Sequence, residues 1–485
     1  MDFALARESG RWNLFLFVGN SLVTETAVHQ PAIPRLRRVL TLWDLIFYGI
    51  VVIQPIAAVP LFGIGQKLSN GHMVTTILIA MLAMMLTASS YGRMASLYPV
   101  AGSAYTYVGR GLNAHLGFVT GWMIFLDYLI VPVTGIIYSS LTVQRLLTPF
   151  VPKLPPQLLF ALLASFFAAA ITALNLRGVR TAAKANIGLL FIMSVVIVLF
   201  IVLAIRYVSR LHGWAGIFSL EPFYNSRTFH LPAIATATSF AALTYIGFDS
   251  VTTLAEDVHN PRRNILLATV IVCVFTGIFS GLQIYLGQLV WPNWRTFPNL
   301  ETAFMDVTRR VGGPILFSAI AVILVVSNFG AALSGQIGAA RLLFSMGRDS
   351  VLPRSVFAYL DPKKKNPAYN ILIIGVLAFA GAMVLSYELA AECLNFGAFL
   401  GFMGVNLAAF REFYLRRRGG QERRFFMDAL LPIAGFLFCL AIWVSLPLPA
   451  KIAGSCWLLV GLIYDAIQTR GFQTEPTMVD FSDLS

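Results

Sequence analysis

The sequence predicts an all-α integral membrane protein with about twelve transmembrane helices, and two observations carry this prediction. Of the 485 residues, 58% are hydrophobic and only 12% are charged, whereas soluble domains have about 45–50% apolar and about 25% charged residues. The apolar residues also stand in blocks of about 20, the length that a helix needs to cross the hydrocarbon core of a bilayer. These features exclude most soluble enzymes and all disordered or collagen-like chains.

Twelve such blocks follow one another along the chain. The third and the eighth exceed about 30 residues, which is typical of helices that tilt or extend beyond the lipid. The predicted spans are residues 42–66, 73–96, 115–146, 157–175, 184–208, 230–256, 264–290, 314–345, 367–387, 390–413, 429–446 and 450–468.

The distribution of basic residues predicts the orientation. An even number of spans places both termini on the same side of the membrane. If that side is cytoplasmic, about 25 of the 35 Lys and Arg lie in the inner loops and tails, as the positive-inside rule requires. We therefore expect a multi-pass protein of the bacterial inner (plasma) membrane with cytoplasmic N- and C-termini. The net charge of +13 lies in these loop clusters and not on a polar face with interleaved aromatics, so we expect no nucleic-acid partner.

The predicted domain organisation follows from the spans. Residues 1–40 form a cytoplasmic N-terminal tail, in which residues 12–18 are apolar but too short to span a bilayer, so we expect an interfacial or disordered segment. Residues 41–210 hold spans one to five and residues 211–415 hold spans six to ten, as two repeats. Residues 416–470 hold two peripheral spans, and residues 471–485 form a cytoplasmic C-terminal tail.

Two spans are predicted to be broken. The first carries Gln54-Pro55 and then Pro60, and proline removes a backbone donor and clashes with the preceding turn. The sixth places Gly247 and Asp249 in mid-membrane. Spans one and six begin the two halves of a five-plus-five arrangement, and interrupted helices at corresponding positions of two halves point to a transporter site. The alternative is an ordinary proline kink and a glycine used for helix packing, which neighbouring helices tolerate.

Several sequence blocks resemble one family of transporters. Residues 98–103 read Tyr-Pro-Val-Ala-Gly-Ser and residues 346–349 read Met-Gly-Arg-Asp. Together with residues 69–72 and 247–256, they resemble the amino acid–polyamine–organocation (APC) superfamily, in the pattern of the bacterial putrescine importers. The resemblance implies ten core helices in an inverted repeat of the LeuT type, plus two peripheral helices. It also implies secondary active import of a small amine, polyamine or amino acid by alternating access, with proton coupling.

The resemblance also implies which residues line a substrate site near the midplane. They come from spans one, three, six, eight and ten, and unwound backbone is allowed at that depth only where it lines a cavity. Carried over by position, the substrate-binding residues are Val52, Ile53, Gln54, Asp127, Tyr128, Ser239, Phe240, Thr244, Tyr245, Gly247, Asp249, Asn328, Phe329 and Phe396.

The chain departs from the family pattern at three places. Amino-acid-transporting relatives carry a Gly-x-Gly turn at the first break to hold the substrate carboxylate, but residues 53–57 read Ile-Gln-Pro-Ile-Ala, as in polyamine-type members. Putrescine importers place an acidic residue a few positions later, where this chain has Pro60. Some proton-coupled relatives have a lysine in span five, where this chain has Met193, so lysine-based coupling does not carry over.

The intramembrane carboxylates are the candidate functional charges. A carboxylate at the centre of a bilayer costs about 2.5–3.5 kcal/mol on insertion scales, which makes Asp127 a functional candidate, and a hydrogen-bonded structural role is the alternative. We expect Asp127 to replace the acid missing at Pro60, as partner of an amine cation and as proton carrier. Asp249 is expected to pair with the freed backbone at the second break.

Charges nearer the membrane edges have less specific interpretations. Glu256-Asp257 and Arg262-Arg263 allow a gate salt bridge, although exposed loop pairs are worth only about 0–1 kcal/mol. Glu388 and Glu392 are interpreted as interfacial, because they flank the outer end of span ten.

The sequence lacks the motifs of enzymes and of metal sites. It has no Walker loop, dinucleotide fingerprint, HExxH or GxSxG motif, so we expect a non-enzyme without cofactors. The four cysteines lie far apart in apolar runs and predict neither a metal site nor a disulfide framework; they are expected to be small buried hydrophobes. The expected partners are an organic amine or amino acid substrate, protons and the lipid bilayer. An exchanger or a facilitative, channel-like carrier remains the alternative.

Overall fold

The computed structural model describes residues 3–8, 11–17, 22–24, 40–99, 103–177, 182–255, 258–348, 352–362, 364, 366–416 and 424–474. The chain forms two units, residues 1–38 and residues 39–485. Within the described part of the second unit, ten helices are long and apolar enough to cross a membrane, and two shorter apolar helices, α1 and α12, accompany them. The prediction of an all-α membrane protein is confirmed, and the count of twelve spans stays a prediction.

The first unit contains a small antiparallel sheet that the sequence analysis did not predict. Its strands are β1 (Phe3–Glu8), β2 (Arg11–Phe17) and β3 (Leu22–Thr24), paired in the order β1-β2-β3. Strand β2 reads Arg-Trp-Asn-Leu-Phe-Leu-Phe, and aromatic residues favour strands. The expectation of an interfacial or disordered tail therefore differs from the structure. An apolar segment that is too short to span a bilayer is still long enough to form a β-strand.

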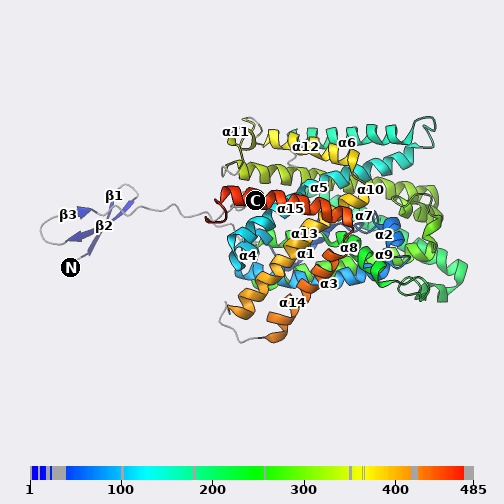
Figure 1. Cartoon of the computed structure of the whole chain (residues 1–485), viewed down its shortest axis with the longest axis horizontal. Helices are drawn as coiled ribbons and strands as arrows, with labels where there is room; N and C mark the ends of the chain where they lie inside the picture. The colour runs from blue at the N-terminus through cyan, green and yellow to red at the C-terminus, as the bar shows by residue number, and fades with distance from the viewer. Residues whose placement is uncertain are drawn as a thin grey trace. The chain divides into compact units, whose positions relative to one another are not determined.

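The second unit is a bundle whose long helices run largely side by side (Figure 1). In chain order its helices are α1 (Leu42–Ile53), α2 (Phe62–Leu68), α3 (Met73–Leu97), α4 (Ser103–Gly111), α5 (Ala114–Leu147), α6 (Pro156–Arg177), α7 (Ala182–His212), η1 (Trp214–Phe218), α8 (Leu231–Ala241), η2 (Ala242–Tyr245), η3 (Phe248–Leu254), α9 (Pro261–Val290), η4 (Trp294–Thr296), α10 (Ala303–Arg348), α11 (Arg354–Phe357), α12 (Ala368–Val384), α13 (Tyr387–Phe410), η5 (Arg411–Leu415), η6 (Phe426–Leu430), α14 (Leu431–Val444) and α15 (Leu448–Gln468).

The first predicted span is broken where its prolines lie. Helix α1 begins at a capping box in which the Thr41 and Asp44 side chains cap each other's backbone amides. It ends at Ile53, because Gln54 takes a φ of 72° and Pro55 has no N–H to continue the ladder. Residues 54–61 form successive turns before α2 begins. The predicted break is confirmed.

The sixth predicted span is also broken, over a longer stretch than expected. Helix α8 ends at Ala241, and two 3₁₀ segments, η2 and η3, follow it. Gly247 lies between them with a φ of 108°, a conformation that glycine adopts without the steric penalty of a Cβ atom. The unwinding therefore begins at residue 242, five residues before the glycine that predicts it.

Helix α10 is interrupted next to Pro314, where the eighth span is predicted to begin. Its 46 residues are interrupted at Gly313, whose φ of 66° is not helical. The segment before Gly313 is a separate helical piece, and the segment after it carries the apolar span. Helix α5 has 34 residues with Pro132 inside it, in agreement with the predicted length of span three.

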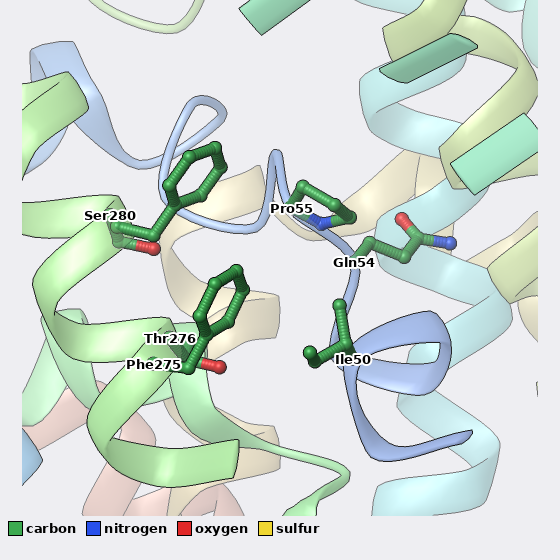
Figure 2. A pocket seen from close by; sticks show the side chains of 7 residues that line it. Ile50, Gln54, Pro55, Phe275, Thr276 and Ser280 are labelled. Carbon is green, nitrogen blue, oxygen red and sulfur yellow. The ribbon is translucent and has the colours of Figure 1, made fainter. Parts of the chain in front are cut away.

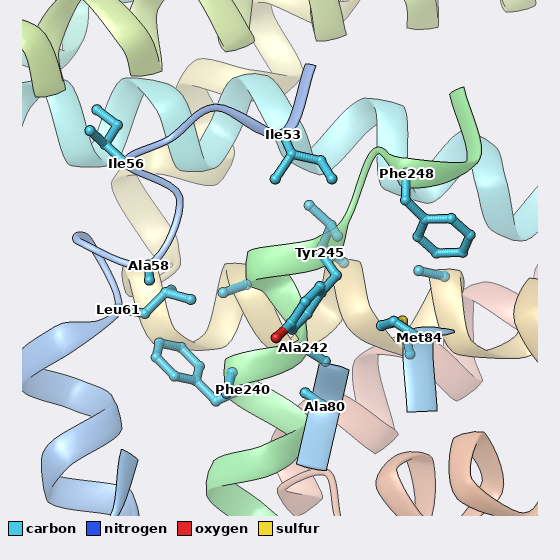
Figure 3. Close-up of a cluster of buried hydrophobic side chains, with 14 of the residues drawn as sticks. Ile53, Ile56, Ala58, Leu61, Ala80, Met84, Phe240, Ala242, Tyr245 and Phe248 are labelled. Atoms are coloured by element: carbon cyan, nitrogen blue, oxygen red, sulfur yellow. The ribbon is translucent and has the colours of Figure 1, made fainter. Parts of the chain in front are cut away.

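The core of the bundle surrounds both breaks. Figure 3 shows Ile53, Ile56 and Leu61 from the first break near Phe240 and Tyr245 from the second, and all five are at most 6% exposed.

One cysteine differs from expectation: Cys273, Cys393 and Cys439 are buried, but Cys456 is exposed. Cys456 lies on α15. The apolar run around it indicates a membrane helix, but it does not indicate which face of that helix is buried.

Candidate functional site

The two broken helices touch each other at the point where each is interrupted. A Cβ atom placed on Gly247 would lie 2.9 Å from Cγ1 of Val52, one residue before the end of α1. Only a glycine permits this approach without a shift of the neighbouring side chain. The contact brings the last turn of α1 and the start of η3 together, as the five-plus-five prediction requires of a site between two repeats.

The side chains at this junction are unequally exposed on the two sides of the first break. Tyr48 and Val52, on α1, are 36% and 37% exposed, and Tyr128 on α5 is 41% exposed. On the far side of the first break, Ile56 and Leu61 are 1% and 0% exposed. The junction is therefore more exposed on the side of α1 than beyond the break.

Tyr48 is a site residue that sequence reasoning missed. Its hydroxyl lies within hydrogen-bonding reach of the Ser250 and Thr253 hydroxyls of η3, and Asp249 is near it. Ser250 and Thr253 donate their own protons to the carbonyls of Gly247 and Ser250, so both can accept from Tyr48. A tyrosine one turn before Val52, on the same helical face, was the available signal.

Two carboxylates from different helices lie at the junction. Asp127 of α5 and Asp249 of η3 are within direct electrostatic range of each other and of Tyr128. Among the described residues neither forms a salt bridge, and Oδ1 of Asp127 is buried without any hydrogen-bond partner. The backbone amides of Gly247 and Ser250 face the Asp249 carboxylate. Asp249 is thus held by unwound backbone, whereas Asp127 is not.

Neutral amide side chains tie the first break to its neighbours. Gln54 Nε2 donates to the Ser327 carbonyl of α10 at 3.4 Å, and the Ser327 hydroxyl donates to Gln54 Oε1. Gln283 of α9, 0% exposed, donates to the Pro55 carbonyl at 2.9 Å. Ser327 and Gln283 were also missed, although polar residues within predicted spans could have signalled them.

A narrow cleft lies on the other face of the first break. Figure 2 shows Ile50 and Pro55 across from Phe275, Thr276 and Ser280 of α9, with the Gln54 side chain turned away from α9. The cleft has room for little more than a water molecule, far less than the roughly 300–1,000 Å³ of small-molecule sites. It has no charged lining residue, so the carboxylates at the junction are the better candidate for a cation.

A second cleft of about 310 Å³ lies between α4, α5 and α10. Its seven lining residues are apolar or aromatic and include Trp122, Phe125 and Met346. No charged or amide side chain lines it, so it cannot compensate the charge of an ammonium group.

The predicted residues of span six lie deep in the core. Ser239 and Phe240 are 0% exposed, and the Ser239 carbonyl accepts a bond from Asn395 at 2.7 Å. The Thr244 hydroxyl is buried without a partner. The Tyr245 hydroxyl donates to the Ile77 carbonyl of α3 at 2.8 Å, so it faces away from α5.

Three further predicted residues make contacts with other parts of the bundle. Phe396 is 0% exposed and packs on Trp443 of α14 with ring centroids 5.0 Å apart. Phe329 packs on Phe167 of α6 at 6.1 Å. The Asn328 amide donates to its own helix at 2.9 Å. Their assignment to the substrate site stays a prediction.

Two further expectations concern charges outside the junction. Glu392 is 2% exposed, so its side chain is buried within the protein, and its position at the membrane interface stays a prediction. Its helix packs against other helices at that end. The proposed gate pair of Glu256-Asp257 with Arg262-Arg263 cannot be placed, because residues 256–257 lie outside the described residues.

The position at which some relatives carry a lysine is occupied by Met193. It is 1% exposed on α7 and carries no charge.

Comparison with known proteins identifies the family. The model of the amino acid permease family matches residues 49–448, which include both breaks and both carboxylates at the junction. The chain belongs to the amino acid permease family of the APC superfamily. It is therefore a multi-pass membrane transporter and not an enzyme.

Three relatives illustrate the range of the family. The low-affinity putrescine importer PlaP of Escherichia coli K12 is 30% identical over 90% of this chain and 95% of its own length. The methylthioribose transporter of Bacillus subtilis is 26% identical over 92% and 96%. The branched-chain amino acid permease BcaP of Bacillus subtilis is 26% identical over 90% and 94%.

Proposed function

We propose that the chain imports a small cationic amine of the polyamine class across the bacterial inner membrane, with protons as coupling ions. The observation that carries this proposal is the pair of neighbouring carboxylates, Asp127 and Asp249, without a basic partner among the described residues. Two adjacent carboxylates repel each other, and a cation between them removes the repulsion. The relative PlaP is named as a putrescine importer, which supports this substrate class.

The backbone at the first break supports an amine over an amino acid. Pro55 and Pro60 have no N–H, and the amides of Ala57, Val59 and Leu61 donate within the turns. Three of the donors that a substrate carboxylate would need are therefore already in use. The carboxyl group of an amino acid would also stand next to two carboxylates of like charge, which is unfavourable.

Unequal exposure of the junction supports alternating access. With the N-terminus in the cytoplasm, as we propose from the positive-inside rule, the more exposed side faces the cytoplasm and the less exposed side faces outward. Import then requires a second conformation in which the far side of the first break opens. Because neither carboxylate forms a salt bridge among the described residues, one can bind the amine while the other carries a proton inward in the same step, as symport requires.

Uptake of radiolabelled putrescine into proteoliposomes tests the proposal. Asp127→Asn should abolish uptake, and Asp127→Glu should keep partial activity with a shifted pH dependence. Glu221→Gln, which changes an exposed carboxylate in the loop before α8, is the matched control. Normal purification and thermal unfolding of all variants exclude misfolding. Uptake by Asp127→Asn at the wild-type rate across pH would refute the amine site.

The same assay separates the coupling mechanisms. Proton symport predicts that a protonophore stops accumulation, whereas replacement of sodium by choline leaves it unchanged. Strict sodium dependence contradicts the proton proposal. Uptake that needs substrate inside the vesicles indicates an exchanger, and insensitivity to both treatments indicates a facilitator.

A further inference from the structure

Three carboxylates gather at the opposite end of the bundle from the Leu42 end of α1. Glu301 precedes α10, and Glu388 and Glu392 lie one helical turn apart on α13. Glu388 is within electrostatic range of both Glu301 and Glu392. We call Glu301, Glu388 and Glu392 the outer carboxylate cluster, because this end faces outward in the proposed orientation. Like charges this close repel each other, so the cluster needs a counter-charge.

The described residues supply no salt-bridge partner for the cluster, although the net charge of the chain is +13. Among the described residues, none of the three carboxylates forms a salt bridge, and Oε1 of the 2%-exposed Glu392 has no hydrogen-bond partner. The nearby arginines are engaged elsewhere: Arg145 pairs with Asp306 at 2.7 Å, and Arg310 lies over the Trp291 ring.

An orphaned tyrosine hydroxyl provides an independent observation. Tyr138 of α5 is 0% exposed, and its hydroxyl has no hydrogen-bond partner in the described structure. It lies within electrostatic range of Glu301 and Tyr387, and its ring centroid is 5.1 Å from that of Tyr387. A buried hydroxyl without a partner costs about 1–3 kcal/mol, so a ligand donor at this place would satisfy it.

The electrostatics of Glu301 agree with a position partly removed from water. Burial raises its pKa above the usual range, and the Glu388 carboxylate adds to the rise. The raised pKa reflects an environment in which a bound cation would stabilise the charged form.

We propose that the outer carboxylate cluster and Tyr138 form a recruitment site that binds the primary ammonium group of the substrate before it reaches the central junction. Carboxylates supply charge-assisted hydrogen bonds to an ammonium group, and the aromatic rings of Tyr138 and Tyr387 can add cation–π attraction. The site rests on the proposed amine substrate. It differs from the central junction because no residue is shared between them.

Kinetics of putrescine uptake by the variant Glu388→Gln/Glu392→Gln test this site. We expect KM to rise about three- to tenfold with unchanged Vmax, because the variant removes two of the three carboxylates that would bind the ammonium group and the site acts before translocation. Tyr138→Phe should raise KM about twofold and keeps the ring. Glu221→Gln is again the matched control. The wild-type KM should rise with ionic strength more than that of the double variant.

Direct binding separates failure of this site from failure of the proposed function. In Asp127→Asn protein the central site is silenced, and titration with putrescine should show weak binding that Glu388→Gln/Glu392→Gln removes. Binding without any uptake by the wild type supports the recruitment site and overturns the proposed function. Amine uptake with an unchanged KM in the double variant overturns the recruitment site alone. Saturation of the cluster by calcium, without competition from putrescine, also overturns it.

Discussion

Substitution of Gly247 by alanine tests the contact between the two broken helices. A left-handed backbone costs an L-residue roughly 1–2 kcal/mol, and Gly247 has a φ of 108°. The new Cβ would also lie 2.9 Å from Cγ1 of Val52, inside the optimal carbon–carbon separation of about 3.5–4.0 Å. Val52 is 37% exposed and can move, so this overlap adds about 1 kcal/mol, at the low end of overpacking costs. We expect Gly247→Ala to destabilise the protein by about 2–3 kcal/mol in total.

Gly213→Ala is the matched control, because it isolates the backbone contribution. Gly213 has a φ of 67°, and a Cβ there meets nothing within 4 Å. Chemical unfolding of detergent-purified protein should therefore show a cost of only about 1–2 kcal/mol for Gly213→Ala. Adding Val52→Ala to Gly247→Ala should recover about 1 kcal/mol as a coupling energy. Putrescine uptake should fall for Gly247→Ala alone, because only that change displaces a side chain at the junction.

Two results would refute this reasoning. Equal destabilisation by Gly247→Ala and Gly213→Ala would mean that no steric contact exists at the break. A coupling energy near zero between Val52→Ala and Gly247→Ala would mean that the ends of α1 and η3 do not meet.

Three further predictions address the break, its access and its limits. Gln283→Met leaves the buried Pro55 carbonyl without a hydrogen bond and should lower the free energy of unfolding by about 1–2 kcal/mol. The control Gln144→Met breaks an exposed bond of the same kind and should lower it by less than about 0.5 kcal/mol. Equal losses of stability would contradict the role of Gln283. Polar thiol reagents added from the cytoplasmic side should label a cysteine at Val52, with protection by substrate, and not one at Ile56; labelling of both would contradict one-sided access. Phe396→Ala should cost about 3–5 kcal/mol through a core cavity but leave KM unchanged, and a large change in KM would return Phe396 to the site.

The positions of both breaks were predictable because proline and glycine act through the backbone. Pro55 has no backbone N–H to donate within a helix, whatever its surroundings. Gly247 adopts a left-handed backbone conformation that residues with a Cβ atom avoid. The extent of unwinding from residue 242 was not predictable, since Ala242 and Leu243 have no local preference against a helix.

The faces of the helices were harder to predict than the helices themselves. Phe329 and Phe396 lie on the expected spans but pack on α6 and α14. An aromatic residue in a membrane helix is equally apolar towards lipid, protein or a substrate, so composition does not fix its direction. Tyr48 and Gln283 reach the breaks only through tertiary packing, and their sequence surroundings resemble those of other spans.

The side chains that anchor the first break are neutral amides, whereas the two carboxylates at the junction form no salt bridge among the described residues. Neutral amides, Gln54 and Gln283, tie the unwound segment to α10 and α9, and backbone amides face Asp249. Of the two carboxylates at the junction, Asp127 has a buried oxygen without a hydrogen-bond partner among the described residues. A cationic side chain in place of either glutamine would compete with an amine substrate for that carboxylate, because a salt bridge within the protein would neutralise it permanently. Neutral anchors therefore leave the negative charge of the junction available to a substrate and a proton, which is the condition for moving both together.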